Sequence, residues 1–288
     1  MNITIAALPK PFIGHIGIIQ RNAVQAWLQM HPRPQIILFG NEEGTAAVAQ
    51  EFHLEHVPHV RCNPHGTPYL RDVFQEAERR MSGDLLCYSN CDIILFQDFI
   101  DAAQKLIDHF QKFLLVGECM NLDVKTPIDF SSPSWEHDLR TFMTEKGKRR
   151  GVCADYFAFT KGFYADIPEL VLGRPYFDNW AIWNARHQGM PVIDATGRIT
   201  AIHQNHFYAA VAGEKPGSHK GDEAEDNLKA MGGKSRIFWT TDRTHTLTAG
   251  GLKRDWMSTL LLRRRSQGAV KKMKYRIVDA LRVMRLHE

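Results

Sequence analysis

The sequence predicts an α/β protein: an open, mostly parallel mixed sheet with helices on both faces, followed by a helical extension at the C-terminus. Two observations predict this class. Short apolar runs typical of buried strands alternate with segments whose apolar residues recur at helical spacing, and the unit repeats about every 25 residues in the first third of the chain. The 288 residues, 44% of them hydrophobic, suffice for one large domain or two small ones.

The first strand is predicted at residues 3–8, an apolar run that ends at a Pro-Lys-Pro sequence. The next helix is predicted at residues 17–30, where Ile18, Ala23 and Trp27 have helical spacing. The same alternation predicts a strand at 35–40, a helix at 43–52, a strand at 59–63, a helix at 69–81 and a strand at 85–90. Thr67 and Pro68 are expected to cap and open the helix at 69–81.

The second half of the chain is less regular. Residues 122–150 are polar, contain prolines and a basic run, and are expected to cross the outside of the domain. Around them the pattern predicts strands at 113–118, 153–161, 192–196 and 199–208, a helix entered by a loop at 176–189, and a loop with a short helix at 212–233.

The C-terminal segment differs from the body in charge. Between Lys253 and Glu288 there are eleven Lys or Arg residues against three Asp or Glu residues, although the net charge of the whole chain is only +4. Apolar residues at helical spacing from Gln267 to Leu286 predict a basic amphipathic helix. We therefore expect one globular domain at residues 1–250 and a helical tail at 251–288.

The tail has two interpretations: a terminal helix docked on the domain, or a helix that contacts an anionic membrane surface. Nucleic acid is not an expected partner, because aromatic residues are not interleaved with the basic run. The N-terminus has no basic segment followed by a long apolar one, and no apolar run spans a bilayer. We expect a cytoplasmic protein, with peripheral contact at the inner face of the membrane as an option.

Polar residues with metal-binding chemistry follow several predicted strands. Asn90 and Asp92 lie where the strand at 85–90 ends, and in open parallel sheets ligands bind at the carboxyl ends of strands. Asp178 precedes a helix, and His203 and His206 lie in a late strand. Carboxylate and imidazole ligands, completed by phosphate oxygens, suit Mn²⁺ or Mg²⁺.

Four motifs in this order resemble the glycosyltransferases of the GT-A (Rossmann-like) fold, family-2-like members of the nucleotide-diphospho-sugar transferase superfamily. SNCDI resembles the DxD metal motif, GVCADYFAFTKG the acceptor-side strand, FDNWAIWNARHQG the EDW-x-R segment, and HQNH the late histidine that completes the metal site. The resemblance covers residues 2–208. It implies transfer of a sugar from a nucleotide-diphosphate donor to a hydroxyl of a glycan, lipid-linked or other acceptor, with Mn²⁺ or Mg²⁺ and with inversion.

The resemblance also implies roles for the metal and donor residues. Asp92 is the expected metal ligand, whereas Asn90 carries no charge and is expected to bind a ribose hydroxyl or a metal-bound water. His206 is the preferred second ligand over His203, because residues three apart in an extended strand point to opposite faces unless the chain turns. The nucleoside is expected at four residues that follow the first two strands: Pro9, Lys10, Asn41 and Glu42.

The general base is expected to be a carboxylate that accepts the proton of the acceptor hydroxyl. Asp178 is the candidate. If the EDW motif is aligned strictly with Asp178-Asn179-Trp180, however, its usual base position falls on Asn179, which cannot accept a proton. A helix N-cap is the other role considered for Asp178. Asp155 is the second catalytic candidate, as the residue that orients the acceptor.

Two other functions fit parts of the pattern. A nucleotidyltransferase would build a related sheet, but the chain lacks a Gly-rich, basic phosphate loop after the first strand. A catalytically silent protein that binds a nucleotide sugar or glycan would explain Asn90 and Asn179.

Overall fold

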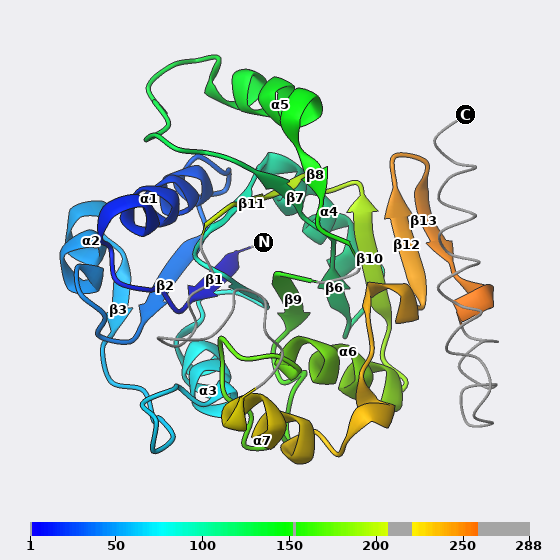
Figure 1. Cartoon of the computed structure of the whole chain (residues 1–288). Helices are drawn as coiled ribbons and strands as arrows, with labels where there is room; N and C mark the ends of the chain where they lie inside the picture. The colour runs from blue at the N-terminus through cyan, green and yellow to red at the C-terminus, as the bar shows by residue number, and fades with distance from the viewer. Residues whose placement is uncertain (1, 152–153, 207–220, 259–288) are drawn as a thin grey trace.

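A computed structural model describes residues 2–151, 154–206 and 221–258 of the chain (Figure 1). The strands are β1 (Ile3–Ala7), β2 (Gln35–Phe39), β3 (Glu55–Val57), β4 (Leu85–Ser89), β5 (Ile93–Leu95), β6 (Leu114–Val116), β7 (Met120–Leu122), β8 (Lys148–Arg149), β9 (Tyr156–Thr160), β10 (Val192–Gly197), β11 (Ala201–Gln204), β12 (His245–Thr248) and β13 (Gly251–Arg254). The helices are α1 (Gly14–Leu28), α2 (Thr45–Phe52), α3 (Leu70–Arg80), α4 (Gln97–Ile107), α5 (Trp135–Lys146), α6 (Phe177–His187) and α7 (Asp222–Ala230), with 3₁₀ turns η1 (Lys234–Arg236) and η2 (Thr240–Asp242).

The main sheet is mixed and mostly parallel, as predicted. Its nine strands lie in the order β13-β12-β10-β6-β9-β4-β1-β2-β3. Only β9 and β13 run antiparallel to their neighbours. Because β9 is reversed, the residues before it lie at the edge where β1, β2, β4 and β6 end, and this edge gathers the polar residues that the sequence singled out.

Helices cover both faces of the main sheet. One face of β1 carries Ile3 and Ile5, which pack in the core layer that contains Trp27 of α1. Ala6 points the other way, into the layer that contains Phe74 of α3 and Trp180 of α6. This alternation follows from the two-residue period of a strand that is buried on both faces.

A second, four-stranded sheet crosses the carboxyl edge of the first, in the order β5-β11-β7-β8. Strand β11 pairs antiparallel with β5 and parallel with β7. The segment at 122–150 was predicted to run over the outside, and this is wrong in part: it contributes the end of β7, helix α5 and β8. The second sheet brings residues near 92, 120, 150 and 203 together.

Three local predictions are also corrected. The third strand is Glu55–Val57 and not residues 59–63; Pro58, which has no N–H to donate, follows it directly. Helix α3 begins at Leu70 with Tyr69 as its N-cap residue, so Thr67 does not cap it. Strands β12 and β13 were not predicted, and the boundary after residue 250 falls within their hairpin. The predicted amphipathic helix of the tail lies outside the described residues.

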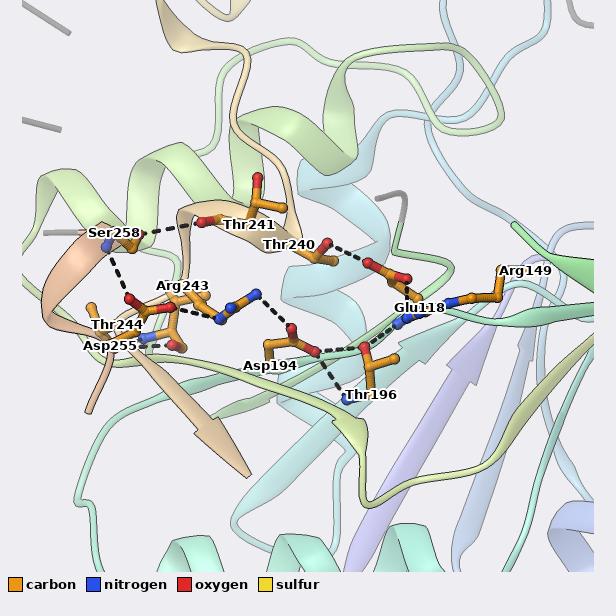
Figure 2. A network of polar contacts seen from close by, with 11 residues as sticks. Glu118, Arg149, Asp194, Thr196, Thr240, Thr241, Arg243, Thr244, Asp255 and Ser258 are labelled. Carbon is orange, nitrogen blue, oxygen red and sulfur yellow. Dashed lines mark hydrogen bonds and ion pairs between the residues drawn. The ribbon is translucent and has the colours of Figure 1, made fainter. Parts of the chain in front are cut away.

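A polar network joins the segments that flank the β12–β13 hairpin to β10 of the same sheet (Figure 2). Arg243 donates to Asp194 of β10 at 3.1 Å and to Asp255 at 2.9 Å. The Asp194 carboxylate accepts from Thr196, whose hydroxyl in turn accepts the backbone N–H of Glu118, two residues after the end of β6. The network therefore runs from the C-terminal hairpin to the carboxyl edge of the sheet.

Replacing Arg243 by alanine is expected to destabilise the protein by roughly 2–4 kcal/mol, because it leaves two largely buried carboxylates without their shared cation. Thermal and urea unfolding followed by circular dichroism measures this loss. Replacement of the exposed Arg254 by alanine serves as the control and is expected to cost less than about 0.5 kcal/mol. Equal stability of the two variants would show that the network does not hold the hairpin.

Among the residues described, no helix has the length and apolar character that crossing a membrane requires.

Candidate active site

The first part of the site is the turn between β4 and β5. The backbone N–H of Ile93 donates to the carbonyl of Asn90 at 3.2 Å, which closes a tight turn around Cys91 and Asp92. The backbone N–H of Asn90 donates to the carbonyl of Asp155 at 3.1 Å. The Asn-Cys-Asp sequence is thus fixed at the carboxyl edge, between β4 and the residue that precedes β9.

Two histidines from β11 and its end meet Asp92. His203 pairs with Ile93 across the second sheet, which places it beside Asp92. Residues three apart in a strand point to opposite faces, but β11 ends at Gln204. His206 lies beyond the strand, so its side chain can point to the same place as that of His203. His206 Nε2 lies 2.9 Å and His203 Nε2 3.8 Å from the same oxygen, Oδ2 of Asp92.

Buried Gln204 holds the backbone under this cluster. Its side-chain amide donates to the carbonyls of Ile19 in α1 and Asp92, at 2.7 and 3.1 Å. Its amide oxygen accepts from Asn22 at 3.1 Å, and its backbone N–H donates to the Asp92 carbonyl at 3.2 Å. One side chain therefore ties α1, the Asp92 turn and β11 together, which fixes the distances between the three candidate ligands.

The cluster fits a divalent cation. Ligand atoms of Asp92, His203 and His206 lie within 4.8 Å of one another. Oδ1 of Asp92 is buried and accepts no hydrogen bond from the described residues. The same holds for Oδ1 of Asn121, which pairs with His203 in β7 and projects from the same face of the sheet. Two buried oxygens without donors, next to two imidazoles, form a donor set suited to Mn²⁺ or Mg²⁺.

The protonation states agree with this fit. Burial lowers the pKa of His203 to about 3, so its imidazole is neutral at neutral pH and has a lone pair for a metal. Burial opposes ionisation of Asp92, but the hydrogen bond from His206 and the nearby charges, Lys10 included, outweigh it and lower the pKa of Asp92. Asp92 is therefore a carboxylate beside a neutral imidazole.

Asp155 lies on the other side of Asn90. Its carboxylate pairs with Arg150 through Nε at 3.0 Å and accepts weakly from the Asn90 amide at 3.4 Å. Burial raises the pKa of Asp155 to about 6, and the charge of Asp92 adds to this effect while Arg150 opposes it. Arg150 is thus the cation that keeps a second buried carboxylate close to Asp92.

Asp178 lies in the first turn of α6. The aromatic ring of Phe177 packs against Tyr88 of β4 and Phe157 of β9, which holds the start of α6 against the sheet. Burial raises the pKa of Asp178 to about 6, and the charge of Asp155 adds to it. Asp178 is the second residue of the helix and not its N-cap, which is Tyr176. Tyr176 has φ of +85°, a conformation uncommon for a residue other than glycine.

Asn179, at the position where the motif usually has its base, faces away from the site. It is buried, and its side-chain amide donates to the carbonyl of Phe238 at 2.8 Å. The amide therefore secures the segment before η2, and the ionisable group at the start of α6 is Asp178.

Comparisons with known proteins were made on sequence and on structure. No protein-family model and no curated protein sequence matches the chain. Among solved structures, GalNAc-T7 with UDP, GalNAc and Mn²⁺ is similar over 80% of this chain and 48% of that chain, with a TM-score of 0.52 and 11% identity. The chain has a GT-A-type fold.

Two other matches are more distant. A Desulfovibrio desulfuricans protein described as a nucleotide-diphospho-sugar transferase has a TM-score of 0.43 at 11% identity, over 80% of this chain and 95% of that one. TarS from S. aureus has a TM-score of 0.34 at 9% identity, over 43% of this chain and 37% of that one. The chain thus spans less than half the length of TarS and of GalNAc-T7. At these identities the likeness concerns the GT-A fold alone.

The nucleoside end of the GT-A fold was predicted at the ends of β1 and β2. Gln20 clamps the Lys10 backbone, accepting its N–H at 2.7 Å and donating to its carbonyl at 2.8 Å. Lys10 is exposed, yet surrounding protein lowers the pKa of its ammonium group, while the charge of Asp92 raises it. Pro9 is buried beside it. The described residues include no hydrogen bond or ion pair that joins Asn41 or Glu42, both exposed, to the metal cluster.

Arg150 and Gln204 contact residues of the candidate site, and neither was predicted from the sequence to do so. Arg150 stands in a Lys-Gly-Lys-Arg-Arg run that has the composition of an exposed loop, and only the pairing of β8 with β7 shows that it reaches the site. Gln204 lies between the two candidate histidines, and its burial was not predicted. The sequence offered one indication that Gln204 is buried and hydrogen-bonded: it is an uncharged polar residue within a predicted strand.

Proposed function

We propose that the protein is a metal-dependent, inverting glycosyltransferase that transfers a sugar from a nucleotide-diphosphate donor to a hydroxyl acceptor. The observation that carries this proposal is the cluster of Asp92, His203 and His206 at the carboxyl edge; Asp155, which contacts Asn90, and Asp178 are carboxyl groups whose pKa is raised. One group of residues suits a cation and a diphosphate. The other provides carboxylates with raised proton affinity, as a general base requires.

Each residue has a role in this proposal. Asp92, His206 and His203 hold Mn²⁺ or Mg²⁺, which when bound neutralises charge on the departing nucleoside diphosphate. Pro9, Lys10, Asn41 and Glu42 bind the donor, with Asn90 on a ribose hydroxyl. Asp178 accepts the proton of the acceptor hydroxyl, and Asp155 orients that acceptor. A glycan or lipid-linked acceptor fits the proposal, as does contact of the basic tail with an anionic membrane.

The alternatives gain less support. The segment between β1 and α1 is a proline-containing turn, whereas a nucleotidyltransferase needs several backbone donors around a triphosphate. A silent binding protein would not require a carboxyl at position 178 whose surroundings raise its pKa and so make it unfavourable to ionise. The strained start of α6 also favours an active enzyme, because strain of this kind clusters at functional sites.

The decisive experiment is a thermal-shift titration of the full chain with UDP, GDP, CDP and dTDP, each with Mn²⁺ or with EDTA. UDP is tested first because the GT-A neighbour GalNAc-T7 was solved with UDP and Mn²⁺. We expect one nucleoside diphosphate to raise the melting temperature only with Mn²⁺; ligand at about 100 times its Kd adds about 2.7 kcal/mol. Slow metal-dependent release of nucleotide from the matching nucleotide sugar would then separate an enzyme from a silent binder. If none of the four nucleoside diphosphates raises the melting temperature, with Mn²⁺ or with EDTA, the proposed function is wrong.

A further inference from the structure

Arg149 and Arg150 are consecutive in the chain, but their side chains lie in different parts of the molecule. Arg149 pairs with Met120 in the second sheet, and the backbone N–H of Arg150 continues this pairing by donating to the carbonyl of Cys119 at 3.1 Å. Neighbouring residues of an extended chain point to opposite faces. Arg149 accordingly pairs with Glu118 at 3.0 Å, and Arg150 pairs with Asp155 at 3.0 Å.

The two environments differ. The Arg149 side chain is 52% exposed and lines, with Glu118 and Thr196, a cavity of about 200 Å³. The Arg150 side chain is 20% exposed and lies beside the candidate metal cluster. Its charge acts on Asp155, His203 and Lys10, three groups that come from three different segments. Arg150 is therefore a cation at the point where those segments converge.

Lys10 and Arg150 repel each other at this point. Burial lowers the pKa of Lys10, and the charge of Arg150 adds to this effect while the charge of Asp92 opposes it. Two cations held close together beside a metal site form a local field suited to a multivalent anion. The guanidinium of Arg150 has five N–H donors in a planar fork that matches phosphate oxygens, and its pair with Asp155 uses Nε.

We propose that Arg150 binds the diphosphate of the donor, sharing its guanidinium between the phosphate oxygens and Asp155. This inference rests on the proposed function and adds a residue that stabilises the charge of the leaving group from the protein side. Asp155 competes with the phosphate for Arg150. Loss of the Arg150 charge and loss of the Asp155 charge therefore have opposite effects on diphosphate affinity.

The test is isothermal titration of the full chain with UDP, UMP and inorganic pyrophosphate, each with Mg²⁺. Arg150→Gln is expected to weaken UDP and pyrophosphate binding about 10- to 100-fold, the range of a charge-assisted hydrogen bond, and to change UMP binding far less. Asp155→Asn is expected to raise UDP affinity, because it removes the group that competes with the phosphate for Arg150. Arg149→Gln is the matched control, one residue away with the same charge, and is expected to bind UDP as the wild type does.

A second variant guards against a folding defect. Arg150→Gln leaves the Asp155 carboxylate without its cation, whereas the double variant Arg150→Gln, Asp155→Asn does not, and it is expected to fold and to show the same weak UDP binding. If Asp155→Asn loses as much UDP affinity as Arg150→Gln, or if Arg150→Gln binds UDP as the wild type does, the inference is overturned and the proposed function stands. If the wild type binds none of UDP, GDP, CDP, dTDP and pyrophosphate, both are overturned.

Discussion

Asp92→Asn is expected to abolish transfer, with a fall of about 10³-fold or more in kcat and a loss of at least about 100-fold in Mn²⁺ affinity. Asp92 is the one carboxylate of the cluster, its Oδ2 is the atom that both histidines approach, and its buried Oδ1 accepts no hydrogen bond from the part of the chain that the structure describes. An amide retains the shape but removes the charge that attracts the cation. Titration of Mn²⁺ followed by electron paramagnetic resonance measures binding independently of activity.

Asp101→Asn is the control for this variant. Asp101 is exposed on α4, where it accepts from Gln97 one turn earlier, so its replacement is expected to leave Mn²⁺ affinity unchanged. The metal-free Asp92→Asn protein is expected to be less stable than the wild type at neutral pH, since His206 and the nearby charges lower the pKa of Asp92 in the fold and so favour its charged form. Tight Mn²⁺ binding by Asp92→Asn would place the metal site elsewhere.

Asp178→Asn is expected to lower kcat by about 10²- to 10⁴-fold while the affinity for nucleoside diphosphate stays within about threefold. The reason is that Asp178 belongs to the start of α6 and has no contact with the histidine cluster among the described residues. In the wild type, kcat/KM is expected to rise with pH up to about 6, where Asp178 loses its proton, and then to level off. Initial rates from pH 4.5 to 8.5 measure the profile, and the residual rate of Asp178→Asn should lack this rise.

The same substitution is expected to stabilise the protein at neutral pH. The pKa of Asp178 rises from an ordinary 3.8 to about 6 on folding, so the folded chain binds this proton more tightly than the unfolded chain. Stability from this group is complete below pH 4 and is lost as the pH rises towards 6, by about 2–3 kcal/mol. Asp178→Asn should therefore melt several degrees higher at pH 7.5 and no higher at pH 4.

Asp166→Asn, a change at an exposed carboxylate in the loop before α6, is the control and is expected to change neither property. If Asp178→Asn keeps more than a tenth of the activity, Asp178 is not the base, and Asp155 becomes the candidate.

The elements that the sequence predicted well are those encoded by local patterns. Strand β2 was predicted at residues 35–40 and observed at Gln35–Phe39, and α6 was predicted at 176–189 and observed at Phe177–His187. The second sheet escaped prediction because β5 and β7 have three residues each and β8 has two, too few to show a period. Long-range pairing, and not propensity, makes these residues strands.

The candidate metal ligands could be named from the sequence, but the residues that hold them in place could not. Asp92 was recognisable as an acid at the end of a buried strand. Both His203 and His206 can lie next to it because β11 ends at Gln204, before His206. Arg150 enters the site through a ladder with Cys119, about thirty residues earlier in the chain, and no local pattern encodes such a pairing. Binding of the donor and metal at these residues stays a prediction until it is measured.

The separation of the ligands along the chain has a consequence for how the protein matures. Asp92 and His206 are 114 residues apart, and their contact requires β11 to insert between β5 and β7. Closing so long a loop costs entropy, so we expect this contact to form late in folding. Until residues 201–204 join the second sheet, β5 and β7 lack the strand that lies between them, and the candidate cation site is incomplete. Completion of the second sheet and assembly of the candidate site are therefore one step, and the fluorescence of Trp27, which donates to the carbonyl of Ile93 next to Asp92, is expected to report on it.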